Sequence, residues 1–139
     1  PPRSIEIELT ESLFYNDMKS LSVLVSRIHH AGLSCSIDDF GSGYSSLNML
    51  KDVKVDAMKL DRVFFESGDN DERGKDIIQS VIKLAQALDL HTISEGVEER
   101  KQVEFLKEMH CDLIQGYVFA KPMPVPEFEQ LAFGTEAAD

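Results

Sequence analysis

Apolar side chains recur at two different spacings along this 139-residue chain, and segments with one spacing alternate with segments that have the other. Residues 5–10 are apolar at every second position, which predicts a strand. Residues 17–31 are apolar at the i, i+3, i+4 and i+7 positions of a helix with one buried stripe. The inward positions of this helix are expected to be Leu21, Leu24, Val25 and Ile28.

The same succession of strand and helix continues to the end of the chain. Further strands are predicted at residues 35–37, 55–60, 91–94 and 113–114. Further helices are predicted at residues 45–50, 75–88, 99–109 and 125–131. The expected inward positions of the second and third of these helices are Ile78, Val81, Ile82, Ala85, Leu88, Val103 and Leu106. Residues 67–74 are predicted to form a solvated polar loop, and alternating strands and helices predict a parallel sheet.

The charge balance narrows the possible partners. Twenty-five acidic against 14 basic residues give a formal net charge of −11, which argues against binding nucleic-acid polymers or anionic membranes. No apolar run reaches the length of a membrane span. The two cysteines, Cys35 and Cys111, are expected to be reduced thiols, and we expect a cytoplasmic location. His29 and His30 fall in the last turn of a predicted helix, where the helix dipole explains them better than a metal does.

Each predicted strand ends in a polar or charged side chain. These strand ends are Glu8, Asp38 with Asp39, Lys59, Glu95 and Gln115. Parallel strands bring their carboxyl ends to one edge of the sheet, so these groups are expected to meet there. Carboxylate oxygens favour Mg²⁺ or Mn²⁺, and adjacent carboxylates repel each other unless a cation lies between them. The predicted site therefore suits a metal pair roughly 3.5–4 Å apart, as used in phosphodiester hydrolysis.

A phosphoacceptor receiver domain also has five parallel strands, an acidic pair and a lysine. In that fold the acidic pair ends the first strand and the lysine ends the fifth. Here Asp38 and Asp39 end the second strand and Lys59 ends the third, so the order does not fit. A simple acidic α/β domain with unrelated surface carboxylates is the remaining alternative.

Five short motifs give the chain a resemblance to a known family. They are Glu8–Glu11 (ELTE), Asp38–Tyr44 (DDFGSGY), Lys59–Asp61 (KLD), Glu95–Glu98 (EGVE) and Gln115–Tyr117 (QGY). In order and spacing the chain resembles the EAL domain, the bacterial phosphodiesterase specific for cyclic-di-GMP. The resemblance implies a TIM-type (β/α)₈ barrel, an α/β fold, of which about five βα units lie within residues 1–133. Residues 134–139 are expected to form a tail.

The resemblance also implies an activity and a role for each motif residue. Members of this family hydrolyse cyclic-di-GMP to linear pGpG with two Mg²⁺ or Mn²⁺ ions in a complete site. The implied metal ligands are Glu8, Asp38, Asp39 and Glu95, with Asp38 bridging the ions. The implied catalytic groups are Lys59 at the nucleophilic water, Glu95, Glu98 and Gln115. Gly41, Tyr44 and Gln115 are implied to bind substrate, and Glu11 to anchor the loop formed by residues 40–46.

The Glu-Ala-Leu motif that names the family is absent from this chain, as is the asparagine of the following strand. Both supply ligands to the first metal. We therefore expect the carboxyl-terminal part of a longer domain, inactive or nearly so by itself. Its open edge would be covered by a second copy of the chain or by the missing half of the barrel. The alternative is a non-catalytic EAL-like domain that binds cyclic-di-GMP or a protein partner.

Overall fold

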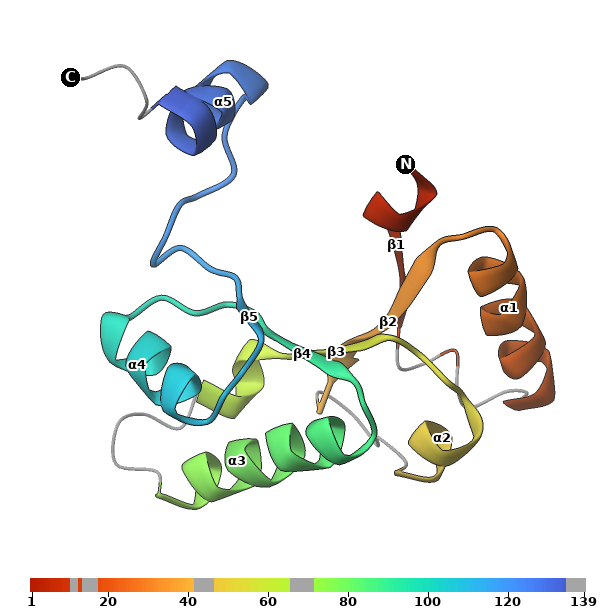
Figure 1. The fold of residues 1–139 in the computed structure, drawn as a ribbon. Coiled ribbons are helices and arrows are strands. Elements are labelled where there is room, and N and C mark those ends of the chain that lie inside the picture. The colour runs from red at the N-terminus through yellow and green to blue at the C-terminus, as the bar shows by residue number, and fades with distance from the viewer. Residues whose placement is uncertain (11–12, 14–17, 42–46, 66–71, 135–139) are drawn as a thin grey trace.

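The computed structural model describes residues 1–10, 13, 18–41, 47–65 and 72–134 (Figure 1). Five parallel strands form one sheet in the order β1-β2-β3-β4-β5, so each strand lies beside its predecessor. The strands are β1 Glu6–Thr10, β2 Ser34–Phe40, β3 Ala57–Leu60, β4 His91–Ser94 and β5 Leu113–Ile114. The α-helices are α1 Met18–His30, α2 Leu47–Asp52, α3 Glu72–Ala87, α4 Arg100–Glu108 and α5 Val125–Phe133. Short 3₁₀ turns span Pro2–Ser4 and Arg62–Phe65.

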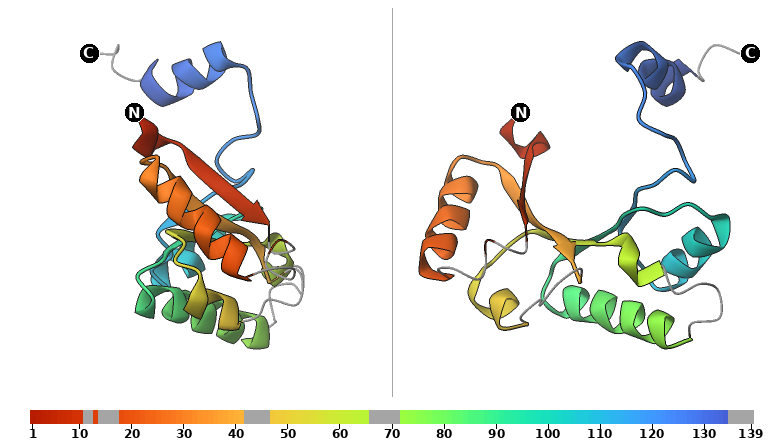
Figure 2. Two further views of the ribbon diagram at one scale, coloured as in Figure 1. Left: turned by 90° about the vertical axis from the view of Figure 1, so that its right-hand side faces the viewer. Right: turned by 180° about the vertical axis from the view of Figure 1, so that it is seen from behind.

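Helices α1 to α4 lie against one face of the sheet and enclose the core with it (Figures 1 and 2). The core combines strand residues such as Ile37 and Met58 with helix residues such as Ile82 and Leu106, all of which are fully buried. Burying each of these side chains contributes about 1.5–3 kcal/mol. The sequence of strand, helix and adjacent parallel strand confirms the α/β arrangement expected from the hydrophobic pattern.

Most predicted inward positions are buried and Val81 is partly buried, but two positions are exposed. Leu24 is 41% exposed, because α1 packs against β2 and α2 along a narrow stripe that includes Leu21, Val25 and Ile28. Leu88 is 42% exposed, because α3 ends at Ala87 and the helical period ends with it. The loop predicted over residues 67–74 was wrong at its end, since α3 begins at Glu72.

The opposite face of the sheet carries no helix from α1 to α4 (Figure 2). Helix α5 stands apart from the sheet, and none of its residues is buried. Several large apolar side chains of this region are exposed, namely Leu113, Tyr117, Phe119, Val125, Phe128, Leu131 and Phe133. Within the described residues, β1 and β5 each pair on one side only. The sheet is therefore an open part of a barrel, since closing a (β/α)₈ barrel takes eight strands.

Gly116, directly after β5, is packed against the backbone of Val97. A Cβ at Gly116 would lie 2.0 Å from the Val97 carbonyl oxygen and 2.4 Å from its nitrogen. Because backbone cannot move aside as a flexible side chain can, we expect Gly116→Ala to lower the free energy of unfolding by about 3 kcal/mol. Urea titration measures this. At Gly134 a Cβ meets only the flexible Gln130 side chain, so Gly134→Ala is the control and should cost less than about 0.5 kcal/mol.

Candidate active site

The register of the sheet places the charged strand ends on its uncovered face. Glu8 pairs with Ser36, which lies two residues before Asp38 on β2. Lys59 on β3 lies opposite the position of β4 that is two residues before Glu95. Because side chains alternate between the faces of a sheet, these groups point to the same side. The convergence predicted from the strand ends is thus a consequence of the parallel register.

Lys59 is the centre of this group. Its Nζ lies 2.6 Å from Glu8 Oε1, 2.9 Å from Glu95 Oε1 and 3.0 Å from Asp38 Oδ1. The Lys59 side chain is only 8% exposed, whereas that of Glu8 is 52% exposed. Burial acts to lower the pKa of Lys59, but its contacts with the three carboxylates outweigh burial and raise the pKa above its ordinary value. The ammonium is therefore charged, and it holds together carboxylates from three other strands.

A bulge in β2 separates the two adjacent aspartates. Between Ile37 and Phe40 the register of β2 against β3 shifts, and Asp39 has a φ of 56°. A bulge re-aims the side chains around it, so Asp38 is partly buried while Asp39 is exposed. Burial, the Asp38 charge and a hydrogen bond with Asp61 all raise the pKa of Asp39.

The donor set at this site fits divalent cations with oxygen ligands. Asp38 Oδ1 is buried, and apart from its ion pair with Lys59 it has no hydrogen-bond partner among the described residues. The carboxylates of Glu8, Asp38 and Glu95 contact a single ammonium, and Asp39 lies close enough to Asp38 and Glu95 for their charges to raise its pKa. Such an excess of negative charge is stabilised by a cation, and Mg²⁺ and Mn²⁺ accept these ligands.

Gln115 extends the site toward β5. It lines a shallow hollow on the uncovered face together with Glu8, Lys59 and Phe119. The Gln115 N–H donates to the Ser94 carbonyl at 2.8 Å, which fixes the backbone at this strand end. The hollow thus places an amide beside the charged cluster.

The remaining predicted site residues are distributed differently. Glu98 is exposed near the start of α4, where its N–H donates to Gln102 Oε1 at 3.0 Å, and no described contact joins it to Lys59. Gly41 has a φ of 99°, and a Cβ there would collide with the Phe64 ring. Glu11 and Tyr44 lie outside the described residues.

The structure also assigns a role that the residue pattern did not. Asp61, the last residue of the KLD motif, lies beside Asp39, and its hydrogen bonding and charge help to raise the pKa of Asp39. Asp61 Oδ1 also accepts a hydrogen bond from the Val63 N–H at 2.7 Å, which orients the carboxylate. The position of Asp61 two residues after Lys59 was the only signal in the sequence that could have indicated it.

The EAL domain family model matches residues 1–122 of this chain. The chain belongs to the EAL domain family. The resemblance recognised from the five motifs is thereby confirmed, together with the α/β barrel-type fold. Among the described helices, none combines the length and the apolar character needed to cross a membrane.

Similar proteins include several cyclic-di-GMP phosphodiesterases. NbdA of Pseudomonas aeruginosa is 41% identical over 126 residues, covering 91% of this chain and 16% of that protein. PdeR of Escherichia coli is 42% identical over 127 residues, covering 91% of this chain and 19% of that protein. RocR of Pseudomonas aeruginosa is 40% identical over 136 residues, covering 97% of this chain and 34% of that protein. The chain thus spans about a third or less of each of these relatives.

Similar solved structures belong to the same family, and this chain covers a larger fraction of their length. The EAL domain of Mycobacterium smegmatis DcpA has a TM-score of 0.87 and 34% identity, covering 94% of this chain and 59% of that one. The phosphodiesterase PaMucR in complex with cyclic-di-GMP has a TM-score of 0.84 and 35% identity, covering 91% of this chain and 51% of that one. The open sheet therefore corresponds to part of a larger EAL fold in these proteins.

Proposed function

We propose that this chain supplies the carboxyl-terminal part of an active site that hydrolyses cyclic-di-GMP to linear pGpG. The observation that carries the proposal is the convergence of three carboxylates from separate strand ends on Lys59 Nζ at 2.6–3.0 Å. The proposed substrate is that of the cyclic-di-GMP phosphodiesterases among the relatives, because their matching segments cover nearly all of this chain.

Two Mg²⁺ or Mn²⁺ ions would be held by Glu8, Asp38, Asp39 and Glu95, with Asp38 shared between them. When bound, such ions lower the pKa of a coordinated water and neutralise charge that builds on the phosphate. Among the chain's own groups, Lys59 offers a charged N–H donor to the attacking water or to a phosphate oxygen. Its raised pKa keeps this donor protonated at neutral pH.

The other motif residues complete the proposed site. Gln115 contacts substrate through its amide, and Glu98 supports the charged cluster from the start of α4. Gly41 and Tyr44 bind substrate, and Gly41 allows the close approach of the Phe64 ring. Glu11 anchors the loop at residues 40–46.

The uncovered face indicates how the site is completed. Among the described residues, five strands leave both edges of the sheet unpaired and the apolar side chains of α5 exposed. We propose that the missing barrel strands cover this face and supply the remaining metal ligands, with a homodimer as the alternative. Hydrolysis by these 139 residues alone is then expected to be weak or absent.

A chimeric domain tests the proposal. Residues 1–122 would replace the matching segment of the Mycobacterium smegmatis DcpA EAL domain, which shares the fold at a TM-score of 0.87. We expect the chimera to convert cyclic-di-GMP to pGpG in Mn²⁺, as followed by chromatography, and the isolated chain to do so at least about 100-fold more slowly. Glu95→Gln in the chimera is the matched inactive control.

The same experiment separates the enzyme from a binding module. A folded chimera that binds cyclic-di-GMP but forms no pGpG would favour the non-catalytic alternative. Hydrolysis by the isolated chain at the rate of the chimera would contradict completion of the site by other strands.

A further inference from the structure

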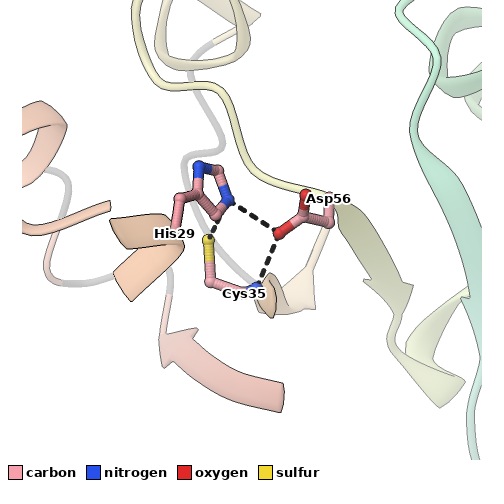
Figure 3. A group of neighbouring side chains, drawn as sticks. All are labelled: His29, Cys35 and Asp56. Carbon is pink, nitrogen blue, oxygen red and sulfur yellow. Dashed lines mark hydrogen bonds and ion pairs between the residues drawn. The ribbon is translucent and has the colours of Figure 1, made fainter. Parts of the chain in front are cut away.

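Three potential metal-binding side chains meet at the end of the sheet opposite the charged cluster (Figure 3). His29 comes from the last turn of α1, Cys35 from the start of β2, and Asp56 from the residue before β3. One ligand atom from each lies within 4.8 Å of the others. Cys35 is fully buried, whereas the side chains of His29 and Asp56 are 37% and 41% exposed. The group is therefore open to solvent on one side and closed by the core on the other.

One nitrogen, His29 Nε2, lies near both of the other side chains and cannot form a good hydrogen bond with each of them. His29 Nε2 lies 2.8 Å from Asp56 Oδ2 and also 3.8 Å from Cys35 Sγ. A proton on Nε2 can be donated to the carboxylate, but the same nitrogen then has no lone pair for the thiol. In a hydrogen-bonded Cys-His-Asp relay, the histidine would use its two different nitrogens. Three ligand atoms within 4.8 Å of one another are instead an arrangement that a cation can satisfy.

One of these ligands is already oriented by the backbone. Asp56 Oδ2 accepts a hydrogen bond of 2.8 Å from the Cys35 N–H. Support of this kind orients a metal ligand before the metal arrives. An equivalent hydrogen bond joins Asp112 to the Thr92 N–H at 2.8 Å, and His91 Nδ1 lies 3.8 Å from Asp112 Oδ1, but among the described residues no cysteine sulfur completes a group of three ligands there. The carboxylate position alone is thus a feature of the sheet, and the Cys35 sulfur is what distinguishes the first group.

The donor types indicate which metal would bind. A thiolate, an imidazole and a carboxylate suit Zn²⁺, whereas Mg²⁺ prefers oxygen ligands. Tetrahedral zinc places sulfur and nitrogen ligands about 3.5 Å apart, close to the 3.8 Å between Cys35 Sγ and His29 Nε2. The Nε2 to Oδ2 distance of 2.8 Å would widen by about 0.5 Å, which the exposed side chains of His29 and Asp56 allow.

We propose that His29, Cys35 and Asp56 form a zinc site with water as the fourth ligand. The site is distinct from the oxygen-rich cluster around Lys59. It would join the end of α1 to the starts of β2 and β3. Without metal, burial followed by the Asp56 charge raises the pKa of Cys35 to about 11, so the thiol is neutral until a cation displaces its proton. Because its ligands come from three separate segments of the chain, bound zinc would act as a structural link between them.

Cobalt substitution in the 139-residue chain tests the site by a signal that the oxygen-rich cluster cannot give. Co²⁺ bound to a thiolate has a sulfur-to-metal charge-transfer band in the near ultraviolet, and excess Mg²⁺ keeps Co²⁺ from the carboxylates. We expect the wild-type chain to show this band and to lose it when Zn²⁺ is added. His29→Gln, Cys35→Ser and Asp56→Asn should each abolish or strongly reduce it.

Two residues outside the proposed site, one histidine and one cysteine, provide matched controls. His30→Gln changes the adjacent exposed histidine, and Cys111→Ser removes the other cysteine, so both variants should retain the band. Because Cys35→Ser alters a buried position, circular dichroism verifies its fold, and the surface variant His29→Gln keeps the test valid if Cys35→Ser does not fold. Absence of the band in the folded wild type overturns the proposal, as does its persistence in His29→Gln or its loss in Cys111→Ser.

Discussion

Replacing Lys59 with methionine is expected to reduce hydrolysis in the DcpA chimera by about 10²–10³-fold, the usual effect of removing one positioned donor. It should also lower the free energy of unfolding by about 2–3 kcal/mol at neutral pH. Breaking a buried ion pair costs about 3–5 kcal/mol, and the half-exposed Glu8 places this site at or below the lower end of that range. Without the ammonium, three carboxylates face one another uncompensated.

The stability deficit of Lys59→Met is expected to change with pH in a definite direction. In the wild type, the pKa of Lys59 is raised, so its stabilisation is fully present below the unfolded value and is lost as pH rises through the folded value. In Lys59→Met, protonation of the carboxyls relieves their repulsion, so the deficit should be smaller near about pH 4 than near about pH 7. Urea titrations at both pH values measure it.

Lys83→Met is the control for the loss of a positive charge, because Lys83 is exposed on α3. This variant should change both activity and stability little. A Lys59→Met deficit that is equal at the two pH values would mean that lost packing, and not charge, is responsible. Full activity in Lys59→Met would contradict the catalytic role.

Replacing Asp38 with asparagine is expected to reduce Mn²⁺-dependent turnover in the chimera by about 10³-fold or more. Asparagine keeps the shape of the side chain but loses the negative charge that a bridging ligand must supply. Stability should be unchanged or slightly higher without metal, because one of several mutually repelling carboxylates is removed. The expected result is therefore a loss of turnover and of Mn²⁺ affinity without a loss of folding.

Three measurements separate this outcome from simple damage to the fold. Chromatography of pGpG gives turnover, Mn²⁺ titration gives affinity, and thermal denaturation gives stability. Asp76→Asn, on the exposed side of α3, is the matched control and should behave as wild type. Wild-type Mn²⁺-dependent turnover in Asp38→Asn would rule out the proposed bridging role.

Local pattern was sufficient for the elements and for the membership of the charged cluster. The sequence pattern predicted every strand and α-helix that the structure describes, with boundaries that differ by a few residues, but neither of the short 3₁₀ turns. Because parallel strands must bring their carboxyl ends together, Glu8, Asp38, Lys59 and Glu95 could be grouped from sequence alone. The motif order added the family, which the EAL match over residues 1–122 confirms.

Other features depend on contacts between segments that are far apart in the chain. The bulge that separates Asp38 from Asp39 arises from the pairing of β2 with β3, which a single strand's pattern does not contain. Leu24 has the helical spacing of a core residue but is 41% exposed, since α1 is covered only along one stripe. Glu98 belongs to a site motif, and its N–H donates to Gln102 Oε1 of α4, a contact that the motif does not predict.

The sequence by itself determined which elements form and which charged groups end the strands, because both follow from side-chain spacing along the backbone. The tertiary structure decided that one ammonium holds three carboxylates and that His29 lies against Cys35 and Asp56. The second result changes the interpretation of His29, which the helix dipole alone had explained. Such groups are set by register and packing between elements, and these distances are not encoded in the spacing of any one segment.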